Sequence, residues 1–323
     1  MPTTEVTGAQ PTCLACSGPI QSQGTLPLSL VLGLYRELFG LRWSEQELRE
    51  FAFADQECFS CPACSLRQFP KATPGPAGFY RRLAQTLPWY YPEQRWETGP
   101  VLDWVKPTHE VVEIGCGSGR FIKHAAARGR KVTGFELSEE AIERGRKDGL
   151  SILHASAAKD YSGNFDGLLL LQVLEHVPDP RSFVQEHLHL VKKGGYVMVS
   201  VPLLDSWCGY VPDPLAYPPH HVTSWTERSL RALGERLGLQ TICVRAQPVT
   251  LRKMRGQMRK MQGLSRRALP VYFAAPRPSW PEETILRKLH SSFYPHAAAE
   301  LLGRQRWAWR FHTGLAVYRV AEA

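Results

Sequence analysis

The strongest constraint on the fold is a regular alternation of apolar runs and helical segments in the middle of the chain. Five runs rich in Val, Ile, Leu and Phe are separated by stretches of helical periodicity: Glu110–Ile114, Lys131–Glu136, Ser151–His154, Phe165–Leu171 and Gly195–Val201. Consecutive strands joined by helices run parallel, because the helix carries the chain back across the sheet. A further helix and strand in TERSLRALGERLGLQTICV and a last strand in TGLAVYRVA complete the pattern. The sequence therefore predicts an α/β fold with a seven-stranded, mostly parallel sheet.

Helix-capping residues agree with this alternation. Ser138 stands before two glutamates at the start of one predicted helix. Asp179-Pro180 opens another helix, which is expected to run to Val191 and to end before Gly194.

The first apolar run leads into a glycine-rich turn within VVEIGCGSGRF. Between the first strand and helix of a parallel sheet, such a turn lets the backbone come close to a nucleoside ligand. The dinucleotide pattern G-x-G-x-x-G is not met, because Arg120 and Ile122 occupy the sixth positions of the two frames. The turn is instead E-x-G-x-G-x-G, with its acid at Glu113.

This spacing resembles motif I of the class I S-adenosylmethionine-dependent methyltransferases, which have a Rossmann-like sheet. The resemblance extends from about Phe79 to Val244 and over the last strand, and it implies S-adenosylmethionine as the cofactor. Glu136 matches the family's acid that binds the ribose hydroxyls, while Ser156 stands where an aspartate usually reaches the adenine. The cofactor-binding residues that the resemblance implies are Glu113, Gly115, Cys116, Gly117, Gly119, Glu136, Leu137, Ser156, Ala157 and Gln172.

Three histidines are candidates for the acceptor side of the reaction. If the acceptor is a hydroxyl, a group must take its proton, and imidazole titrates near neutral pH. His176 follows the fourth strand in LEHVPDP, and His220 and His221 lie in YPPHHVTSW after the fifth. We place His221 first, because it fits the family's His-hydrophobic-x-x-aromatic pattern. Each histidine could instead brace its loop, and Glu175 with His176 and a further histidine could ligate a divalent cation, as in some quinone O-methyltransferases that this loop resembles.

Two C-x2-C pairs precede the predicted sheet. Cys13 with Cys16 and Cys61 with Cys64 can supply four thiolates to a structural zinc ion, and both pairs are followed by small residues that let amides approach the sulfurs. Cys58 is either a spare thiol or a true ligand in place of one of these four. The alternative is that the cysteines bind no metal. The resemblance extends to this segment, because a bacterial subgroup of the family has an N-terminal zinc-binding module.

The composition suggests three parts. Residues 1–75 form a cysteine-rich, zinc-ribbon-like module with helices, in which Ser44 and Glu47 predict a capping box. The Pro- and Gly-rich Phe69–Gly78 is the expected linker, and residues 76–247 with 308–323 form the methyltransferase core. Residues 248–307 form a helical insertion before the last strand.

The insertion begins with a basic amphipathic segment. LRKMRGQMRKMQGLSRR carries seven basic residues and no acidic ones, with Leu and Met at helical spacing along one side. Residues 249–267 could therefore bind an anionic substrate, a membrane surface or RNA, or they could lie on the sheet with their charges in water.

The sequence favours an enzyme that methylates a small molecule. The net charge of +9 and a pI near 9.2 suit anionic partners but also many cytosolic enzymes. With no apolar run of roughly 18 residues and no signal-peptide pattern, a cytoplasmic location is expected. O-methylation of a saccharide, lipid-linked or secondary-metabolite acceptor is the first hypothesis. RNA methylation is the second, but the cysteine module has no basic residue before Arg36 and no N-P-P-Y-type tetrapeptide follows the fourth strand, which argues against a nucleic-acid substrate.

Overall fold

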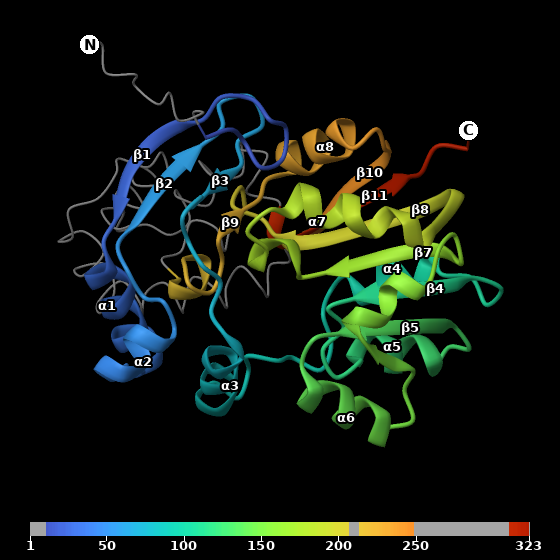
Figure 1. Cartoon of the computed structure of the whole chain (residues 1–323), viewed down its shortest axis with the longest axis horizontal. Helices are drawn as coiled ribbons and strands as arrows, with labels where there is room; N and C mark the ends of the chain where they lie inside the picture. Colours follow the sequence, from blue (N-terminus) through green and yellow to red (C-terminus); the bar gives the residue numbers. More distant parts are fainter. Residues whose placement is uncertain (1–10, 207–212, 249–309, 323) are drawn as a thin grey trace, which may run out of the picture.

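The computed structural model describes residues 11–206, 213–248 and 310–322, and it confirms the predicted α/β fold (Figure 1). One sheet has seven strands in the order β10-β11-β8-β7-β4-β5-β6. Their bounds are β4 (Glu110–Ile114), β5 (Lys131–Glu136), β6 (Ile152–His154), β7 (Phe165–Leu171), β8 (Val191–Pro202), β10 (Gln240–Pro248) and β11 (Arg310–Arg319). The five strands from β8 to β6 run parallel, and β11 is antiparallel to both of its neighbours.

Helices cover both faces of this sheet. One face is covered by α4 (Thr98–Trp104), α5 (Arg120–Ala126) and α6 (Glu139–Lys147), and the other by α7 (Pro180–His187) and α8 (Glu227–Arg236). Successive strand residues point to opposite faces, so Val111 of β4 packs with the first set and Val112 with the second. Burial on both faces explains why the central strands are apolar throughout.

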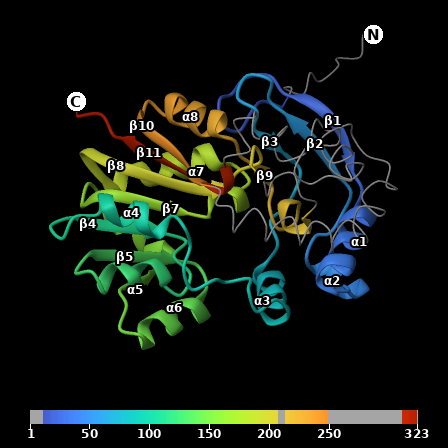
Figure 2. The same ribbon diagram turned by 180° about the vertical axis from the view of Figure 1, so that it is seen from behind.

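A second sheet belongs mostly to the N-terminal part of the chain. It pairs β1 (Gln21–Leu26), β2 (Gln56–Ser60), β3 (Arg67–Gln68) and β9 (Thr223–Ser224) in antiparallel order. The helices α1 (Leu28–Phe39), α2 (Glu45–Glu50) and α3 (Ala77–Thr86) pack around its aromatic and aliphatic core. Both views show this part of the molecule at the side toward which β7 points (Figure 2). It therefore lies at the carboxyl edge of the large sheet.

The structure bears out most of the predicted element boundaries. Ser138 caps α6, Asp179 caps α7, and Ser44 with Glu47 forms the predicted capping box at α2. The helix expected to reach Val191 ends at His187, and a 3₁₀ turn (Leu188–Leu190) leads directly into β8. That expectation was wrong because the junction consists of buried apolar residues, Leu190 and Val191. An apolar pair of this kind fits the end of a helix and the start of a strand equally well.

The segment expected to be a linker is tied to the core by its backbone. The Phe69 N–H donates to the Val222 carbonyl at 3.0 Å, and the Gly75 N–H donates to the Pro219 carbonyl at 2.8 Å. The Phe69 side chain is also buried. Among the described helices, none combines the length and the apolar character that crossing a membrane would require. The predicted basic helix at 249–267 and most of the predicted insertion lie outside the described residues.

Candidate active site

The glycine loop connects β4 to α5 at the carboxyl edge of the large sheet. Gly115, Gly117 and Gly119 all have positive φ angles, of 70°, 56° and 77°. A Cβ on Gly115 would lie 2.9 Å from a methyl of Val173, whereas a Cβ on Gly117 would meet nothing within 4 Å. Gly115 is therefore required by backbone angle and by packing, and the open space at Gly117 leaves the backbone accessible to a ligand.

Glu136, the last residue of β5, faces this loop. One carboxylate oxygen accepts a hydrogen bond from the Gly117 N–H at 2.7 Å. The other accepts from the N–H groups of Leu137 and Ser138 at 2.8 and 3.0 Å. Three amide donors fix the orientation of the carboxylate between the ends of β4 and β5.

Two further predicted cofactor positions lie near the ends of β5 and β6. Leu137 is 74% exposed, so its apolar side chain is open to a ligand. Ser156, in a 3₁₀ turn (Ala155–Asp160) after β6, places its hydroxyl 2.8 Å from Nδ1 of His154. The Ser156 N–H also donates to Nδ1 of His154, so this nitrogen is an acceptor. The Ser156 hydroxyl must therefore donate to Nδ1 as well, and its own lone pairs stay free.

Gln172 directly follows β7 and is a non-glycine residue at a φ angle of 59°. Its Nε2 lies 3.3 Å from the Ser200 hydroxyl, which in turn lies 3.4 Å from a carboxylate oxygen of Glu97. Because Nε2 is the donor in this chain, the carbonyl oxygen of the Gln172 side chain stays available as an acceptor. The strained backbone angle at a strand end is typical of functional positions.

Two buried carboxyl groups lie at the same edge of the sheet. Glu113 is 4% exposed and Glu175 is 1% exposed, and each has one oxygen, Oε2, with no hydrogen-bond partner among the described residues. Burial raises the pKa of both groups to about 8. Both side chains are thus mainly protonated at pH 7, and each has an oxygen that a ligand could use.

The three predicted catalytic histidines come together in one cluster. Candidate ring nitrogens of His176, His220 and His221 all lie within 4.8 Å of one another. The loops that carry them are joined by the Val222 N–H, which donates to the Glu175 carbonyl at 2.9 Å. Burial lowers the pKa of His176 to about 4 and keeps the pKa values of His220 and His221 well below the usual value. The cluster is therefore uncharged at neutral pH.

Local hydrogen bonds define which ring nitrogens can accept a proton. Nδ1 of His176 lies 2.7 Å from the His220 carbonyl, and Nδ1 of His220 lies 2.7 Å from the Leu215 carbonyl, so both Nδ1 atoms carry the hydrogen. The Tyr90 hydroxyl then donates to Nε2 of His220 at 2.6 Å. Nε2 of His176 keeps its lone pair, and His221 forms no side-chain hydrogen bond to another described residue.

Several side chains at this site carried no signal in the sequence. Tyr80 of α3 lies 3.2 Å from Nδ1 of His176, and its ring packs against His176 and His220. Glu97, the N-cap residue of α4, is buried behind Gln172. These contacts join segments far apart in the sequence, which no local pattern can predict. Tyr91 is 46% exposed and holds Arg120 against its ring, with the guanidinium carbon 4.8 Å from the centroid, whereas Trp96 packs against the core.

The four predicted zinc ligands form a second cluster. Sγ of Cys13 lies 3.4 Å from Sγ of Cys64, and Sγ of Cys16 lies 3.5 Å from Sγ of Cys61. Zn–S bonds of about 2.3 Å place the sulfurs of a tetrahedral site about 3.8 Å apart. All four ligand atoms lie within 4.8 Å of one another, so the sulfurs have the spacing that such an ion requires.

The two C-x2-C turns also share one backbone geometry. In each turn the first cysteine accepts a hydrogen bond from the residue four positions later, Ser17 or Ser65, at 2.9 and 2.7 Å. Both serines have positive φ angles, of 62° and 64°. Cys58 lies in the separate hydrophobic core of α1 to α3, so the structure places it outside the sulfur cluster.

Comparisons with known proteins agree with this geometry. The sequence profile of a family described as "Methyltransferase domain" matches residues 80–244, just over half of the chain. A ubiquinone biosynthesis O-methyltransferase of Ralstonia nicotianae is 34% identical over 154 residues, covering 41% of this chain and 63% of the relative. One of Aromatoleum aromaticum is 39% identical over 115 residues, covering 31% of this chain and 48% of the relative. The chain thus matches less than two thirds of the length of either relative.

A solved structure of a SAM-dependent methyltransferase from Archaeoglobus fulgidus matches with a TM-score of 0.47 and 15% identity, over 69% of this chain and 91% of that chain. The family assignment itself rests on the matched sequence profile together with the strand order and the glycine loop described above. On these grounds the chain belongs to the class I S-adenosylmethionine-dependent methyltransferases.

Proposed function

We propose that this protein transfers a methyl group from S-adenosylmethionine to an oxygen atom of a small-molecule acceptor. The observation that carries the proposal is the Glu136 carboxylate, which backbone amides hold at the open side of the glycine loop. A carboxylate in this place is an acceptor for the hydroxyls of a ribose. The relatives named as O-methyltransferases support oxygen as the methylated atom.

The residues around Glu136 fit the rest of the cofactor. The exposed Leu137 side chain offers an apolar surface for the adenine ring, and the free lone pairs of Ser156 can accept from its amino group. The unpartnered oxygen of Glu113 and the carbonyl of Gln172 are acceptors near the glycine loop for the amino acid portion. When bound, S-adenosylmethionine supplies a methyl group on a positively charged sulfur. The chain's own task is to align the acceptor and exclude water.

On the acceptor side, we propose that His221 takes the hydroxyl proton and that His176 is the alternative. Both are neutral near pH 7, because burial lowers their pKa values, and the neutral ring is the form that accepts a proton. His220 is better suited to positioning, since both of its ring nitrogens already have partners. The same three side chains have the spacing of a metal-binding group, so a divalent cation that binds the acceptor oxygen is the second candidate for this role.

The surroundings of the histidines favour a ring-shaped acceptor. The rings of Phe79, Tyr80 and Tyr90 lie 6.1, 5.9 and 5.6 Å from the His220 ring, centroid to centroid. Aromatic walls gain most from stacking on another flat ring. Among saccharide, lipid-linked and secondary-metabolite acceptors, we therefore favour those with a phenolic hydroxyl. The RNA alternative depends on residues 249–267, which lie outside the described part of the chain.

We also propose that Cys13, Cys16, Cys61 and Cys64 bind one structural zinc ion. The sulfur spacing and the shared turn geometry support this. The hydrogen bond between Cys13 and Cys64 lowers the pKa of Cys13 to about 5 and raises that of Cys64, so at neutral pH Cys13 is a thiolate, the form that binds zinc. The ion would hold the two C-x2-C turns together.

The test of the function begins with cofactor binding. Isothermal titration should show S-adenosylmethionine binding, and Glu136→Ala should weaken it roughly 10- to 100-fold, as expected for hydrogen bonds to a charged group worth about 1.5–3 kcal/mol. Glu143→Ala removes an exposed glutamate from α6 and serves as the matched control. Equal affinity of the two variants would refute the assignment of Glu136.

The second step identifies the acceptor. A donor with a labelled methyl group is incubated with a panel of catechols, other phenols and sugars, and transfer to a phenolic hydroxyl is expected. Replacing His221 by Gln should then reduce kcat at least tenfold with S-adenosylmethionine affinity unchanged. Transfer only to sugars or to RNA would overturn the acceptor class while leaving cofactor binding in place.

A further inference from the structure

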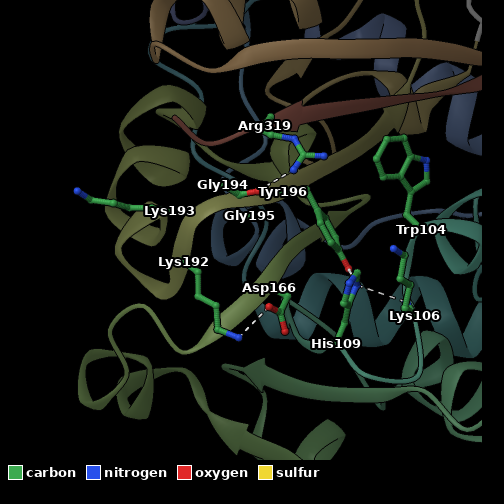
Figure 3. A pocket seen from close by; sticks show the side chains of 10 residues that line it. All are labelled: Trp104, Lys106, His109, Asp166, Lys192, Lys193, Gly194, Gly195, Tyr196 and Arg319. Carbon is green, nitrogen blue, oxygen red and sulfur yellow. Dashed lines mark hydrogen bonds and ion pairs between the residues drawn. The ribbon is translucent and has the colours of Figure 1, made fainter. Parts of the chain in front are cut away.

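A cavity lies at the opposite edge of the large sheet from the glycine loop. It has a volume of about 260 Å³ and lies where β7 and β8 begin and β11 ends, beside the loop from α4 to β4 (Figure 3). Ligands of open parallel sheets bind at the carboxyl ends of the strands, where Glu136 lies. This cavity is at the amino ends of β7 and β8 and is therefore separate from the candidate active site.

The floor of the cavity is the ring of Tyr196, which is held in place by packing and by hydrogen bonds. Gly167 of β7 lies opposite Tyr196 in the sheet, and a Cβ on Gly167 would collide with the ring, so the glycine lets it lie flat over the strand. The Tyr196 hydroxyl is 3.3 Å from Nδ1 of His109, which also accepts from the Lys106 N–H at 3.4 Å. A neutral His109 ring then carries its hydrogen on Nε2, where it can donate.

Cationic side chains outnumber carboxylates around this floor. Four of the lining side chains are cationic: Lys106, Lys192, Lys193 and Arg319. Asp166 is the one carboxylate among the lining residues, and both of its oxygens are already used, by Lys192 at 2.7 Å and by the Glu110 N–H at 2.9 Å. Nearby Glu322 forms no ion pair with the described residues, although it lies beside Gly194.

Two of the cations remain available to a ligand. In Figure 3 Lys192 reaches to Asp166 and Lys193 extends outward, whereas Arg319 and Lys106 lie around the Tyr196 ring near Trp104. The Arg319 Nη1 group donates to the Gly194 carbonyl at 2.9 Å. This hydrogen bond orients the guanidinium and leaves its other N–H groups free among the described contacts. Lys106 forms no ion pair with another described residue.

We propose that this cavity is a binding site for a phosphate group, with Arg319 and Lys106 as its main ligands. Arginine and lysine side chains that line one cavity are common recognition elements for phosphate oxygens, and His109 can add a further donor. The cavity is smaller than the roughly 300–1,000 Å³ of pockets for drug-sized ligands, so it suits a phosphate headgroup more than a whole nucleotide. The same chemistry is found in soluble phosphate esters and in the headgroup of phosphatidate.

The test compares two double variants with equal loss of charge. Arg319→Gln/Lys106→Gln removes the proposed ligands. Arg128→Gln/Lys147→Gln also removes one arginine and one lysine, and Arg128, like Arg319, donates to a single backbone carbonyl. Both double variants are titrated with inorganic pyrophosphate and with glycerol phosphate by calorimetry. At least a tenfold loss of affinity is expected for the first variant and less than a twofold change for the second.

A second measurement distinguishes the two sources of the phosphate. The wild-type protein and both variants are sedimented with phosphatidylcholine vesicles with and without phosphatidate. Binding that needs both phosphatidate and the Arg319/Lys106 pair supports a lipid headgroup, and cavity-dependent binding of the soluble esters alone supports a free metabolite. No binding of any probe, or an equal loss in both variants, overturns the proposal. Titration with S-adenosylmethionine reports separately on the active site and should be unchanged in both variants.

Discussion

At the scale of single residues, Glu113 connects the sequence motif to a measurable property of the protein. Its carboxyl group is buried, and burial raises its pKa to about 8, well above the usual value of 4.5. The folded state therefore prefers the protonated form. This preference contributes stability that is complete below the pKa of the unfolded chain and is lost as the pH rises to about 8.

Glu113→Gln should remove the Glu113 share of the pH dependence, while the share of Glu175, whose pKa burial also raises to about 8, should remain. The lowered pKa values of buried histidines such as His176 affect stability only below about pH 6.5, so the contribution of the carboxyl group is best observed between about pH 6.5 and 8. In that window the wild type should lose up to about 1.4 kcal/mol of unfolding free energy per pH unit from this group. Urea denaturation across the window should give a flatter profile for Glu113→Gln, and an unchanged one for the exposed Glu143→Gln.

At the scale of elements, the glycine loop shows which glycines its geometry requires. Gly115→Ala should destabilise the protein by about 1–3 kcal/mol, because the residue has a positive φ angle and its Cβ would crowd Val173. Gly149→Ala is the matched control, since Gly149 also has a positive φ angle, of 76°, but has open space around it. Thermal unfolding measures the stability of both variants. An equal loss of stability in Gly115→Ala and Gly149→Ala would mean that contact with Val173 has no effect.

The paired C-x2-C turns make a prediction at the same scale. The purified chain should contain one zinc ion, and Cys61→Ser should lose it, because Cys61 is one of the four clustered sulfurs. Cys243→Ser, on β10, should keep the metal. Zinc at a free concentration 1,000 times its Kd would stabilise the fold by about 4 kcal/mol. Elemental analysis measures the metal content, and zinc retained in full by Cys61→Ser would contradict the assignment.

At the scale of the whole molecule, the side chain of Gln68 helps to join the first C-x2-C turn to the histidine loop. Gln68 of β3 accepts from the Leu14 N–H at 2.9 Å and donates to the Thr12 carbonyl at 3.1 Å, next to the first C-x2-C turn. Its backbone pairs with Thr223 of β9, directly after the loop that carries His220 and His221. A change at the four-cysteine cluster can thus reach the loop that carries His220 and His221 through the small sheet.

This connection predicts the effect of zinc removal. A chelator should lower kcat/KM for the acceptor more than it lowers the affinity for S-adenosylmethionine, because Gln68 ties the first C-x2-C turn to the strand after the histidine loop by hydrogen bonds, whereas the sulfurs connect to the glycine loop through apolar packing in the core of the large sheet. Calorimetry and steady-state kinetics measure the two quantities in the same preparation. A parallel loss of both would indicate that the metal supports the whole fold instead.

The large sheet could be predicted closely from the sequence, and the reason is local. The bounds of β4, β5 and β7 agree with the apolar runs because strands buried on both faces have continuous hydrophobic sequences. The junction of α7 and β8 could not be placed, since both sides are apolar. The two C-x2-C pairs predicted the four clustered sulfurs, but the choice between Cys58 and the others required the fold.

The sequence by itself determined the parallel sheet, the glycine loop and the residue types at the ends of its strands, because each depends on neighbours a few positions away. Only the tertiary structure decided how the three histidines meet, which of their nitrogens are free, and that Tyr80, Tyr90 and Glu97 belong to the same site. It also revealed the basic cavity, which is built from residues on four separate segments. Such contacts join residues that are distant in the sequence. They form only when the folded chain packs these segments together, so no local pattern predicts them.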